Sequence, residues 1–331
     1  MQSTRSKLID LLEKNKEQYI SGQSLSEVLG ISRSAIWKHM NELKKDGYII
    51  EAKSNKGYRI IDFPNKLSEN TVKWGLRTKW LGKRIIHHES IASTQTIAHD
   101  EARNNAPGGT IIIADEQTKG RGRIARNWDS SKGKGIWLSM ILRPEIQPHH
   151  APQLTLLTAT VLADVLSNYV DINPKIKWPN DILMNNKKMA GILTEMQAEQ
   201  DQIWYVIIGI GLNVNHSIDD LPEGLRNIAT SIKMETSKEW LLKDLIQEIL
   251  VTFERTYEDY LENGFSEIKQ KWEGYGFKIG QEIAIKTLKE EWKAPFLGIT
   301  DDGALLTKSS SGETIELYSA EIDWFHQTDK S

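Results

Sequence analysis

The chain has no cysteine among its 331 residues, and this absence limits its chemistry. It excludes disulfides, thiolate nucleophiles and cysteine-based zinc sites, and it fits a reducing compartment. No run of about 18 apolar residues is present to span a bilayer, and the N-terminus lacks the apolar core of a signal peptide. We therefore expect a soluble, cytoplasmic protein that has no membrane partner.

Two common nucleotide-binding patterns are also absent. No G-x-G-x-x-G opens a helix, and no G-x-x-x-x-G-K-S/T is present to cradle phosphates. The chain is long enough for two or three domains with real cores, since 39% of its 331 residues are hydrophobic. The net charge of −3 conceals an asymmetry, because residues 1–60 hold 11 Lys and Arg against 7 Asp and Glu. The basic end predicts a polyanionic partner for the N-terminal segment.

The first 60 residues predict three helices. Leu8, Leu11 and Leu12 have the spacing of one helical face. The segment Ser24-Leu25-Ser26-Glu27 has the form of a capping box and predicts that a second helix opens there. Ser32 is the predicted cap of a third helix.

The third helix and the residues after it have features of a DNA-binding unit. Ile36, Met40 and Leu43 recur at helical spacing and are expected to face the core. The outward face then carries Arg33, Ser34, Trp37, Lys38 and Asn41. Two predicted strands, 48–51 and 57–60, flank a basic tip that contains Lys53 and Lys56. The pattern resembles a winged helix-turn-helix domain bound in the major groove, with a protein-contact domain as the alternative.

A strand followed by a loop rich in glycine and arginine organises the middle of the chain. Thr110 to Ala114 is a β-branched apolar run typical of a buried strand. The loop after it contains Lys119, Gly120, Arg121, Gly122, Arg123 and Arg126. Arginine forks and free backbone N–H groups suit carboxylate and phosphate oxygens, so the loop predicts an anion site. For such a run alone, a solvated or nucleic-acid-binding loop is the alternative.

Other stretches place polar groups or glycines at strand and helix ends. Ser93 and Thr94 precede a helix, where their hydroxyls serve either as a cap or as ligand contacts. Residues 175–195 predict a strand, a break at Pro179-Asn180-Asp181 and a hairpin turn. In residues 204–215, two glycines interrupt an apolar strand, which indicates close approach of a ligand or of backbone.

Together these stretches resemble the biotin protein ligases. With the N-terminal domain, the chain is similar to the bifunctional bacterial type that is also the biotin operon repressor. The matching segments are Ser93-Thr94-Gln95, Gln117, Gly120-Arg121-Gly122-Arg123 through Trp128, Lys177-Trp178-Pro179-Asn180-Asp181, Lys188-Met189-Ala190-Gly191-Ile192 and Gly209-Ile210-Gly211-Leu212-Asn213. The resemblance runs from about residue 5 to the C-terminus. It departs from many members at Gln95, where they have Asn, and at Ile124-Ala125, where some have Arg-Gly.

The resemblance implies ATP-dependent activation of biotin to biotinyl-5′-AMP, with release of pyrophosphate. Biotin then passes to a lysine of a carrier such as the biotin carboxyl carrier protein of acetyl-CoA carboxylase. ATP and biotin are the substrates, and Mg²⁺ accompanies ATP. Fixed positive charge suits this reaction, because a carboxylate and an α-phosphate must meet. The resemblance also implies a repressor that binds biotin operator DNA as a homodimer promoted by biotinyl-5′-AMP.

The resemblance and the need for positive charge give a set of expected site residues. The catalytic candidates are Lys188, Arg121 and Arg123. The expected biotin contacts are Ser93, Thr94, Gln95, Gln117, Arg121, Gly122, Arg123, Lys188 and Gly191. The expected adenylate contacts are Arg123, Arg126, Trp128, Asn180, Asp181 and Asn213. Asp181 is either a Mg²⁺ ligand or a partner of the incoming lysine, and the loop from Lys119 to Trp128 is expected to order over the ligand.

The remaining sequence completes an α/β multidomain prediction. Thr236-Ser237-Lys238-Glu239 has the form of a capping box and predicts a long helix through Tyr260. Short strands after Gly274 predict an SH3-like β-barrel. The predicted parts are a winged helix-turn-helix domain at 1–63, a linker at 64–72, a mixed-sheet ligase domain resembling class II synthetases at 73–275, and the SH3-like barrel at 276–331.

Three alternatives remain open from the sequence. A lipoate ligase shares the central architecture, although the N-terminal domain and the arginine loop argue against it. A repressor that senses biotin without catalysis is the non-enzyme alternative. A ligase whose N-terminal domain binds no DNA is the third. If biotinyl-5′-AMP orders the central loops and favours a dimer, two winged helices would be placed on a two-fold operator.

Overall fold

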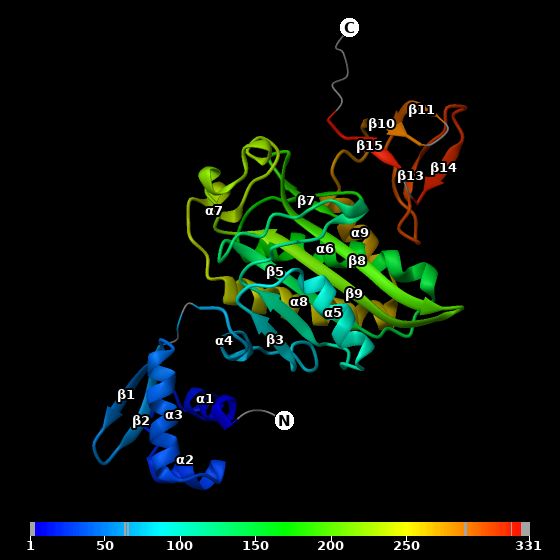
Figure 1. Ribbon diagram of the computed structural model, residues 1–331. Coiled ribbons are helices and arrows are strands. Elements are labelled where there is room, and N and C mark those ends of the chain that lie inside the picture. The colour runs from blue at the N-terminus through cyan, green and yellow to red at the C-terminus, as the bar shows by residue number, and fades with distance from the viewer. Residues whose placement is uncertain (1–3, 63, 65, 288–289, 319, 326–331) are drawn as a thin grey trace. The chain divides into compact units, whose positions relative to one another are not determined.

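The structure is a computed structural model that describes residues 4–62, 64, 66–287, 290–318 and 320–325. The chain divides into two compact units, Met1–Arg77 and Thr78–Ser331, and each is described by itself (Figure 1). Residue 63, which ends the predicted winged helix-turn-helix domain, residue 65 of the predicted linker, and the end of the predicted C-terminal domain lie outside the described residues. Among the described residues, no helix combines the length and the apolar character needed to cross a membrane.

The first unit consists of helices and one strand pair. Its elements are α1 (Thr4–Lys14), α2 (Gly22–Leu29), α3 (Arg33–Lys45), β1 (Ile49–Lys53), β2 (Gly57–Asp62) and α4 (Glu69–Lys73). The core packs Leu8, Leu12, Leu25, Ile36, Met40 and Leu43 together, as the helical spacing predicts. β1 pairs antiparallel with β2 around the turn that carries Lys56. Three helices and an antiparallel wing confirm the predicted fold of this unit.

Two local predictions in the first unit need correction. The second helix begins at Gly22 and not at Ser24, because Ser21 is its cap and accepts from the Ser24 backbone N–H at 3.0 Å. Ser32 caps α3 as predicted, accepting from the Ala35 N–H at 3.2 Å. The stretch expected to be a linker contains most of α4, whose Val72 is fully buried.

The second unit is built on a seven-stranded sheet. Its first elements are β3 (Ile85–His88), α5 (Thr94–Arg103), β4 (Ile111–Ala114), η1 (Arg123–Ala125), β5 (Gly135–Leu142), η2 (Pro148–His150), α6 (Ala151–Asn168), β6 (Lys175–Lys177), β7 (Asp181–Met184), β8 (Lys187–Glu199) and β9 (Gln202–Asn213). The elements that follow are η3 (Ile218–Asp220), η4 (Glu223–Leu225), α7 (Ile232–Thr236), α8 (Leu242–Asn263) and α9 (Ser266–Tyr275). The strand order is β3-β4-β5-β9-β8-β7-β6, parallel only between β3 and β4, which confirms a mixed sheet.

Helices cover both faces of this sheet. α5 packs on one face, where Ala98 and Ala102 contact Ile112, Ile141 and Ile207. α6 and α8 pack together against the other face, as Figure 1 shows behind the strands. α6 is almost entirely apolar along its buried positions, which suits a helix between a sheet and two other helices.

The predicted capping box at residues 236–239 does not open the long helix. α7 ends at Thr236, Ser237 adopts a left-handed conformation, and α8 begins only at Leu242. The Trp240 N–H donates to Asn215 Oδ1 at 3.0 Å, and Asn215 Nδ2 donates to the Trp240 carbonyl at 2.8 Å. These tertiary bonds hold Trp240 in a non-helical segment between the two helices, so a local signal was overridden.

Short antiparallel strands end the chain, as predicted. They are β10 (Glu282–Lys286), β11 (Glu291–Pro295), β12 (Gly298–Ile299), β13 (Leu305–Lys308), β14 (Thr314–Leu317) and β15 (Glu321–Asp323). They form two three-stranded sheets, β11-β10-β15 and β12-β13-β14. β11 and β15 are short and carry charged residues on exposed positions, which makes their strand signal weak.

A buried histidine makes the stability of the second unit sensitive to acid. His216 is 1% exposed and lies edge-on to Trp137 at 6.0 Å between ring centroids. Burial lowers the pKa of His216 below its usual value, although Asp129 and Asp220 oppose the shift. The folded chain therefore holds a neutral ring, while the unfolded chain takes up a proton near the ordinary pKa.

We predict that His216→Gln flattens the acid dependence of unfolding. In the wild type, this group lowers the free energy of unfolding as the pH falls from about 7.5 to about 5.5, by at most roughly 1.4 kcal/mol per pH unit. The variant lacks this contribution, which calorimetry at both pH values measures. The exposed His149 provides the matched control, His149→Gln. Equal pH dependence in wild type and His216→Gln would contradict the assignment.

Candidate functional site

Three glycines leave neighbouring positions of the sheet, together called the glycine floor, without side chains on the α5 face. Gly191 of β8 pairs with Gly211 of β9, and Gly209 lies opposite Leu193 in the same register. A Cβ at Gly209 would lie 2.6 Å from Gln95 Oε1, and a Cβ at Gly211 would lie 2.5 Å from Trp128 Cε2. The predicted close approach at these glycines is therefore made by side chains of the chain itself.

Trp128 and Lys188 lie together over this glycine floor. The Lys188 Nζ is 5.0 Å from the Trp128 ring centroid, and a Cβ at Gly191 would meet both side chains. This arrangement brings a cation, an aromatic face and bare backbone to one place. Such a place suits a flat, anionic ligand.

Asp181 holds Lys188 in position. Its Oδ1 accepts from Lys188 Nζ at 2.7 Å, and its Oδ2 lies 3.3 Å from Lys177 Nζ. Both carboxylate oxygens are thus paired with ammonium groups. This pairing does not fit the tentative role of Asp181 as a Mg²⁺ ligand, since the carboxylate is already neutralised, and we assign no metal to it.

A buried polar group lies at the start of α5. The Thr94 backbone N–H and Oγ1 both donate to Gln117 Oε1, at 2.8 and 3.1 Å. Gln117 Nε2 donates to Ser130 Oγ at 2.8 Å. Ser139 Oγ lies 2.8 Å from Thr94 Oγ1 and donates to Gln95 Oε1 at 3.0 Å. The structure therefore brings together the predicted Thr94, Gln95 and Gln117, and it adds the unpredicted Ser130 and Ser139.

Two buried polar atoms beside this group lack a hydrogen-bond partner within the described part of the chain. They are the Ser93 hydroxyl oxygen and the Trp128 indole nitrogen. Ser93 occupies the cap position of α5, yet its side chain makes no capping bond. Buried polar atoms are normally satisfied, so these two indicate contacts that a ligand would supply.

The second arginine of the loop faces the Lys188 side. Arg123 Nη1 donates to Asn180 Oδ1 at 3.1 Å, and Asn180 Nδ2 donates to the Ile192 carbonyl at 2.7 Å. Arg126 is exposed at the end of the loop, where its carbonyl accepts from the Gly122 N–H at 2.8 Å. Arg123 and Lys188 are therefore the predicted cations that stand near the Trp128 side of the floor.

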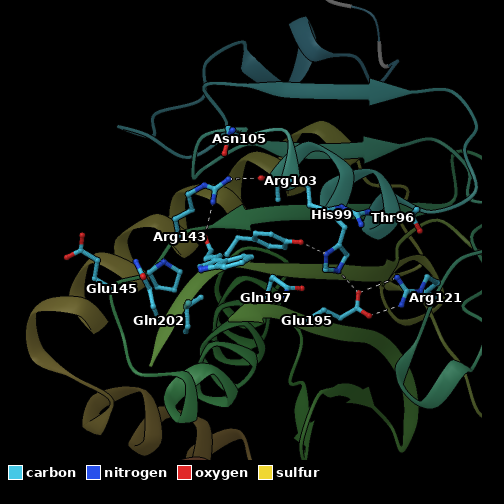
Figure 2. A pocket seen from close by; sticks show the side chains of 15 residues that line it. Thr96, His99, Arg103, Asn105, Arg121, Arg143, Glu145, Glu195, Gln197 and Gln202 are labelled. Carbon is cyan, nitrogen blue, oxygen red and sulfur yellow. Dashed lines mark hydrogen bonds and ion pairs between the residues drawn. The ribbon is translucent and has the colours of Figure 1, made fainter. Parts of the chain in front are cut away.

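The first arginine of the loop is held elsewhere. Arg121 Nη2 donates to Glu195 Oε1 at 2.7 Å, and Nη1 donates to Oε2 at 3.3 Å. Figure 2 shows both side chains at one end of a groove of about 1040 Å³, which also contains His99 and Arg143. The structure thus separates Arg121 from Arg123, although the sequence analysis expected both at one ligand.

Glu195 is a charged group that the sequence analysis missed. His99 Nε2 lies 3.1 Å from Glu195 Oε2, and this hydrogen bond, helped by Arg121, lowers the pKa of the Glu195 carboxyl to about 2 against the effect of burial. The carboxylate is therefore ionised. Its alternation with Gly191 and Leu193 along β8 was a usable signal, since odd positions of this strand face α5.

Asn213 is linked to the Lys188 backbone through hydrogen bonds of the segment 228–230. Its Nδ2 donates to the Thr230 carbonyl at 3.0 Å, and Thr230 N–H donates to the Lys188 carbonyl at 2.9 Å. The Lys188 N–H donates to the Ile228 carbonyl at 2.8 Å. Asn213 thus fixes the segment that in turn fixes the Lys188 backbone.

Most of the residues expected to contact DNA are exposed in the first unit. Arg33, Ser34, Trp37 and Lys38 are exposed on α3, while Asn41 is half-buried. Trp37 is 60% exposed, which is unusual for so large an apolar side chain. On the wing, Lys53 and Lys56 are exposed, and Lys53 lies 3.3 Å from Glu51 and 5.1 Å from the Tyr19 ring centroid.

Models of known families match three parts of the chain. The biotin/lipoate A/B protein ligase family matches residues 88–213, which include the glycine floor and the arginine loop. An HTH domain matches residues 4–59, and the biotin protein ligase C terminal domain matches residues 278–324. The matched segments follow the same order as the structural parts.

Individual relatives agree with the family models. The chain is 47% identical to the Bifunctional ligase/repressor BirA of Bacillus subtilis (strain 168), over 98% of this chain and 99% of the relative. It is 29% identical to BirA of Escherichia coli (strain K12), over 95% of this chain and 97% of the relative. A solved biotin protein ligase from Aquifex aeolicus, in complex with biotin and ATP, is 30% identical with a TM-score of 0.62, covering 73% of this chain and 98% of that chain. Because the identity extends along nearly the whole chain, this chain belongs to the biotin protein ligase family, among the bifunctional ligase/repressors with an N-terminal helix-turn-helix domain.

Proposed function

We propose that the chain activates biotin with ATP to biotinyl-5′-AMP and transfers biotin to a lysine of the biotin carboxyl carrier protein. We further propose that biotinyl-5′-AMP is the corepressor with which it represses the biotin operon. The observation that carries the enzymatic proposal is the glycine floor covered by Trp128 and Lys188. The relatives named above are a ligase/repressor and a ligase bound to biotin and ATP, which supports both parts.

In the first step, a biotin carboxylate oxygen attacks the α-phosphorus of ATP. The bond from the α-phosphorus to the bridging oxygen breaks, and pyrophosphate leaves. Lys188 and Arg123 are proposed to neutralise the carboxylate and the phosphate as they approach, which lowers the electrostatic barrier. Asp181 is a positioning residue for Lys188, and Asn180 is one for Arg123.

In the second step, the acceptor lysine amine attacks the acyl carbon of biotinyl-5′-AMP. AMP leaves, and an amide forms after the amine loses its proton. The chain needs no nucleophile of its own for this sequence, which is consistent with the absence of cysteine. Mg²⁺ is proposed to enter bound to ATP, with few ligands from the protein.

The proposed biotin and adenylate contacts are based on the positions of these residues around the glycine floor. Ser93, Thr94, Gln95, Gln117, Gly122 and Gly191 are assigned to biotin. Trp128, Arg126, Asn180 and Asn213 are assigned to the adenylate side. The unpartnered atoms of Ser93 and Trp128 are the contacts that ligand binding would satisfy. We propose that residues 119–128 close over the adenylate and protect it from water.

Regulation is proposed to act through a homodimer favoured by biotinyl-5′-AMP. Two winged units would then bind the two halves of an operator. Arg33, Ser34, Trp37, Lys38, Asn41, Lys53 and Lys56 are the proposed DNA contacts. ATP, carrier protein and operator are cytoplasmic in a bacterial cell, so this function implies a cytoplasmic location.

The direct test incubates the chain with biotin, ATP and an apo carrier domain. We predict that the carrier gains the mass of one biotinyl group, measured by mass spectrometry, and that pyrophosphate exchange into ATP depends on biotin. Replacing biotin with lipoate is predicted to abolish both signals. Labelling with lipoate alone would establish the lipoate ligase alternative, and binding of biotin without exchange would establish a non-catalytic sensor.

A matched lysine pair tests the proposed charge. Lys188→Ala is predicted to lower biotin-dependent pyrophosphate exchange by roughly 100-fold or more. The variant lacks the positive charge that is proposed to stabilise the biotin carboxylate and the α-phosphate as they approach each other. The Nζ of the neighbouring Lys187 donates to the Arg226 carbonyl at 3.4 Å, whereas Asp181 pairs with Lys188. Lys187→Ala is therefore the control and is predicted to retain near wild-type exchange. Similar losses in both variants would refute the special role of Lys188.

A binding assay tests the repressor proposal. Operator DNA is predicted to bind roughly tenfold more tightly when biotinyl-5′-AMP is present, since a corepressor must favour the DNA-bound state. Lys38→Ala is predicted to weaken binding and to reduce the salt slope by about 1, as expected for one lost phosphate contact. A scrambled duplex of equal length is the control. Equal operator affinity with and without biotinyl-5′-AMP would rule out corepression.

A further inference from the structure

We propose that Glu195 is a positioning residue that anchors the arginine loop through Arg121, while Arg121 itself does not contact substrate. This inference rests on the proposed function and assigns a role within it to a residue outside the expected contact set. The unit formed by Arg121, Glu195 and His99 is called the clasp below. It lies on the α5 face of β8, away from Lys188.

The clasp has the geometry of a fork on a carboxylate. Both terminal nitrogens of Arg121 reach the two oxygens of Glu195, at 2.7 and 3.3 Å. His99 lies 3.1 Å from the same carboxylate, and its other ring nitrogen is 3.4 Å from the Tyr205 hydroxyl (Figure 2). Glu195 lies on β8, His99 lies on α5, and Tyr205 of β9 holds His99, so the carboxylate is anchored to elements that pack together in the sheet domain.

The loop tip has few other ties to the sheet. Gly122 N–H bonds to the Arg126 carbonyl, and Trp128 N–H bonds to the Gly120 carbonyl, so these backbone bonds only close the loop on itself. Arg121 to Glu195 and Arg123 to Asn180 are the side-chain hydrogen bonds that join the tip to β8 and to the strand break before β7. Trp128 packs on the glycine floor at one end of the loop, and the Lys119 N–H donates to the Ala92 carbonyl at the other. If Arg123 is used by the ligand, the clasp is the side-chain hydrogen bond that still holds the tip between these two ends to β8.

The two ties lie on different sides of the loop. Arg123 bonds near Lys188, which is paired with Asp181, whereas Arg121 enters the groove of about 1040 Å³ lined by His99 and Arg143. Gly122 between them is extended, but the turn η1 begins at Arg123 directly after it, so the strand alternation that would put both arginine side chains on one face ends there. Arg123 is thus the arginine that can exchange its Asn180 bond for the anion, while Arg121 holds the loop.

The test compares Glu195→Gln and Arg121→Ala in the full-length chain. Two quantities are measured: hydrogen exchange of residues 119–128 without any ligand, and the rate at which preformed biotinyl-5′-AMP leaves the protein. We expect faster exchange and about fivefold faster release in both variants, with no further increase in the double variant. Glu195→Asp keeps a carboxylate and is expected to bring loop exchange and adenylate release part of the way back to the wild-type rates. Glu145, which lines the same groove, provides the control Glu145→Gln with wild-type behaviour.

The outcomes separate the clasp from the proposed function. If Glu195→Gln leaves exchange and release unchanged while Arg121→Ala alters release, Arg121 acts on the ligand directly and the clasp is wrong. If neither variant changes loop exchange, the clasp is also wrong. If the wild type forms no biotinyl-5′-AMP, the proposed function fails, while the ligand-free exchange experiment still decides whether Glu195 anchors the loop.

Discussion

The proposed active site depends on one constraint: three paired positions near the centre of the sheet, Gly191, Gly209 and Gly211, must carry no side chains on its α5 face. Glycine in a strand weakens the strand by roughly 0.5–1 kcal/mol relative to alanine, because it gains freedom in the unfolded chain. Here that cost is offset by the close packing of two side chains against the glycines. Trp128 lies against Gly191 and Gly211, and Gln95 lies against Gly209. A methyl group at any of the three would displace a side chain of the proposed site.

The glycine floor also determines how charge is arranged above it. Trp128 provides an aromatic face for Lys188, and Asp181 keeps that lysine from turning to solvent. A lysine paired with a carboxylate carries little net field until a stronger anion arrives. The arrangement therefore keeps the Lys188 ammonium group at the site while it is paired with Asp181. A paired ammonium group costs less free energy at a partly buried position than an unpaired one.

Much of this organisation could be predicted from the sequence, because its signals are local. The strand and glycine pattern at 204–215 and the turn at Asn185-Asn186 depend on nearby residues, and β9 and the β7–β8 hairpin follow them. The capping patterns at Ser24 and at 236–239 failed, since competing caps and tertiary bonds decided those positions. The partner of Arg121 could not be predicted, because Glu195 lies 74 residues away and meets it only through the fold.

The same coupling that would make the chain a repressor constrains its enzymatic cycle. If biotinyl-5′-AMP raises operator affinity by some factor, operator DNA must raise biotinyl-5′-AMP affinity by the same factor, because binding free energies around a closed cycle sum to zero. Carrier protein removes the adenylate chemically and therefore opposes DNA binding without touching DNA. A loop that retains the adenylate lengthens the interval in which the repressor form exists. Slow loss of the adenylate would thus be useful to both activities, and the proposed anchoring of residues 119–128 would couple them.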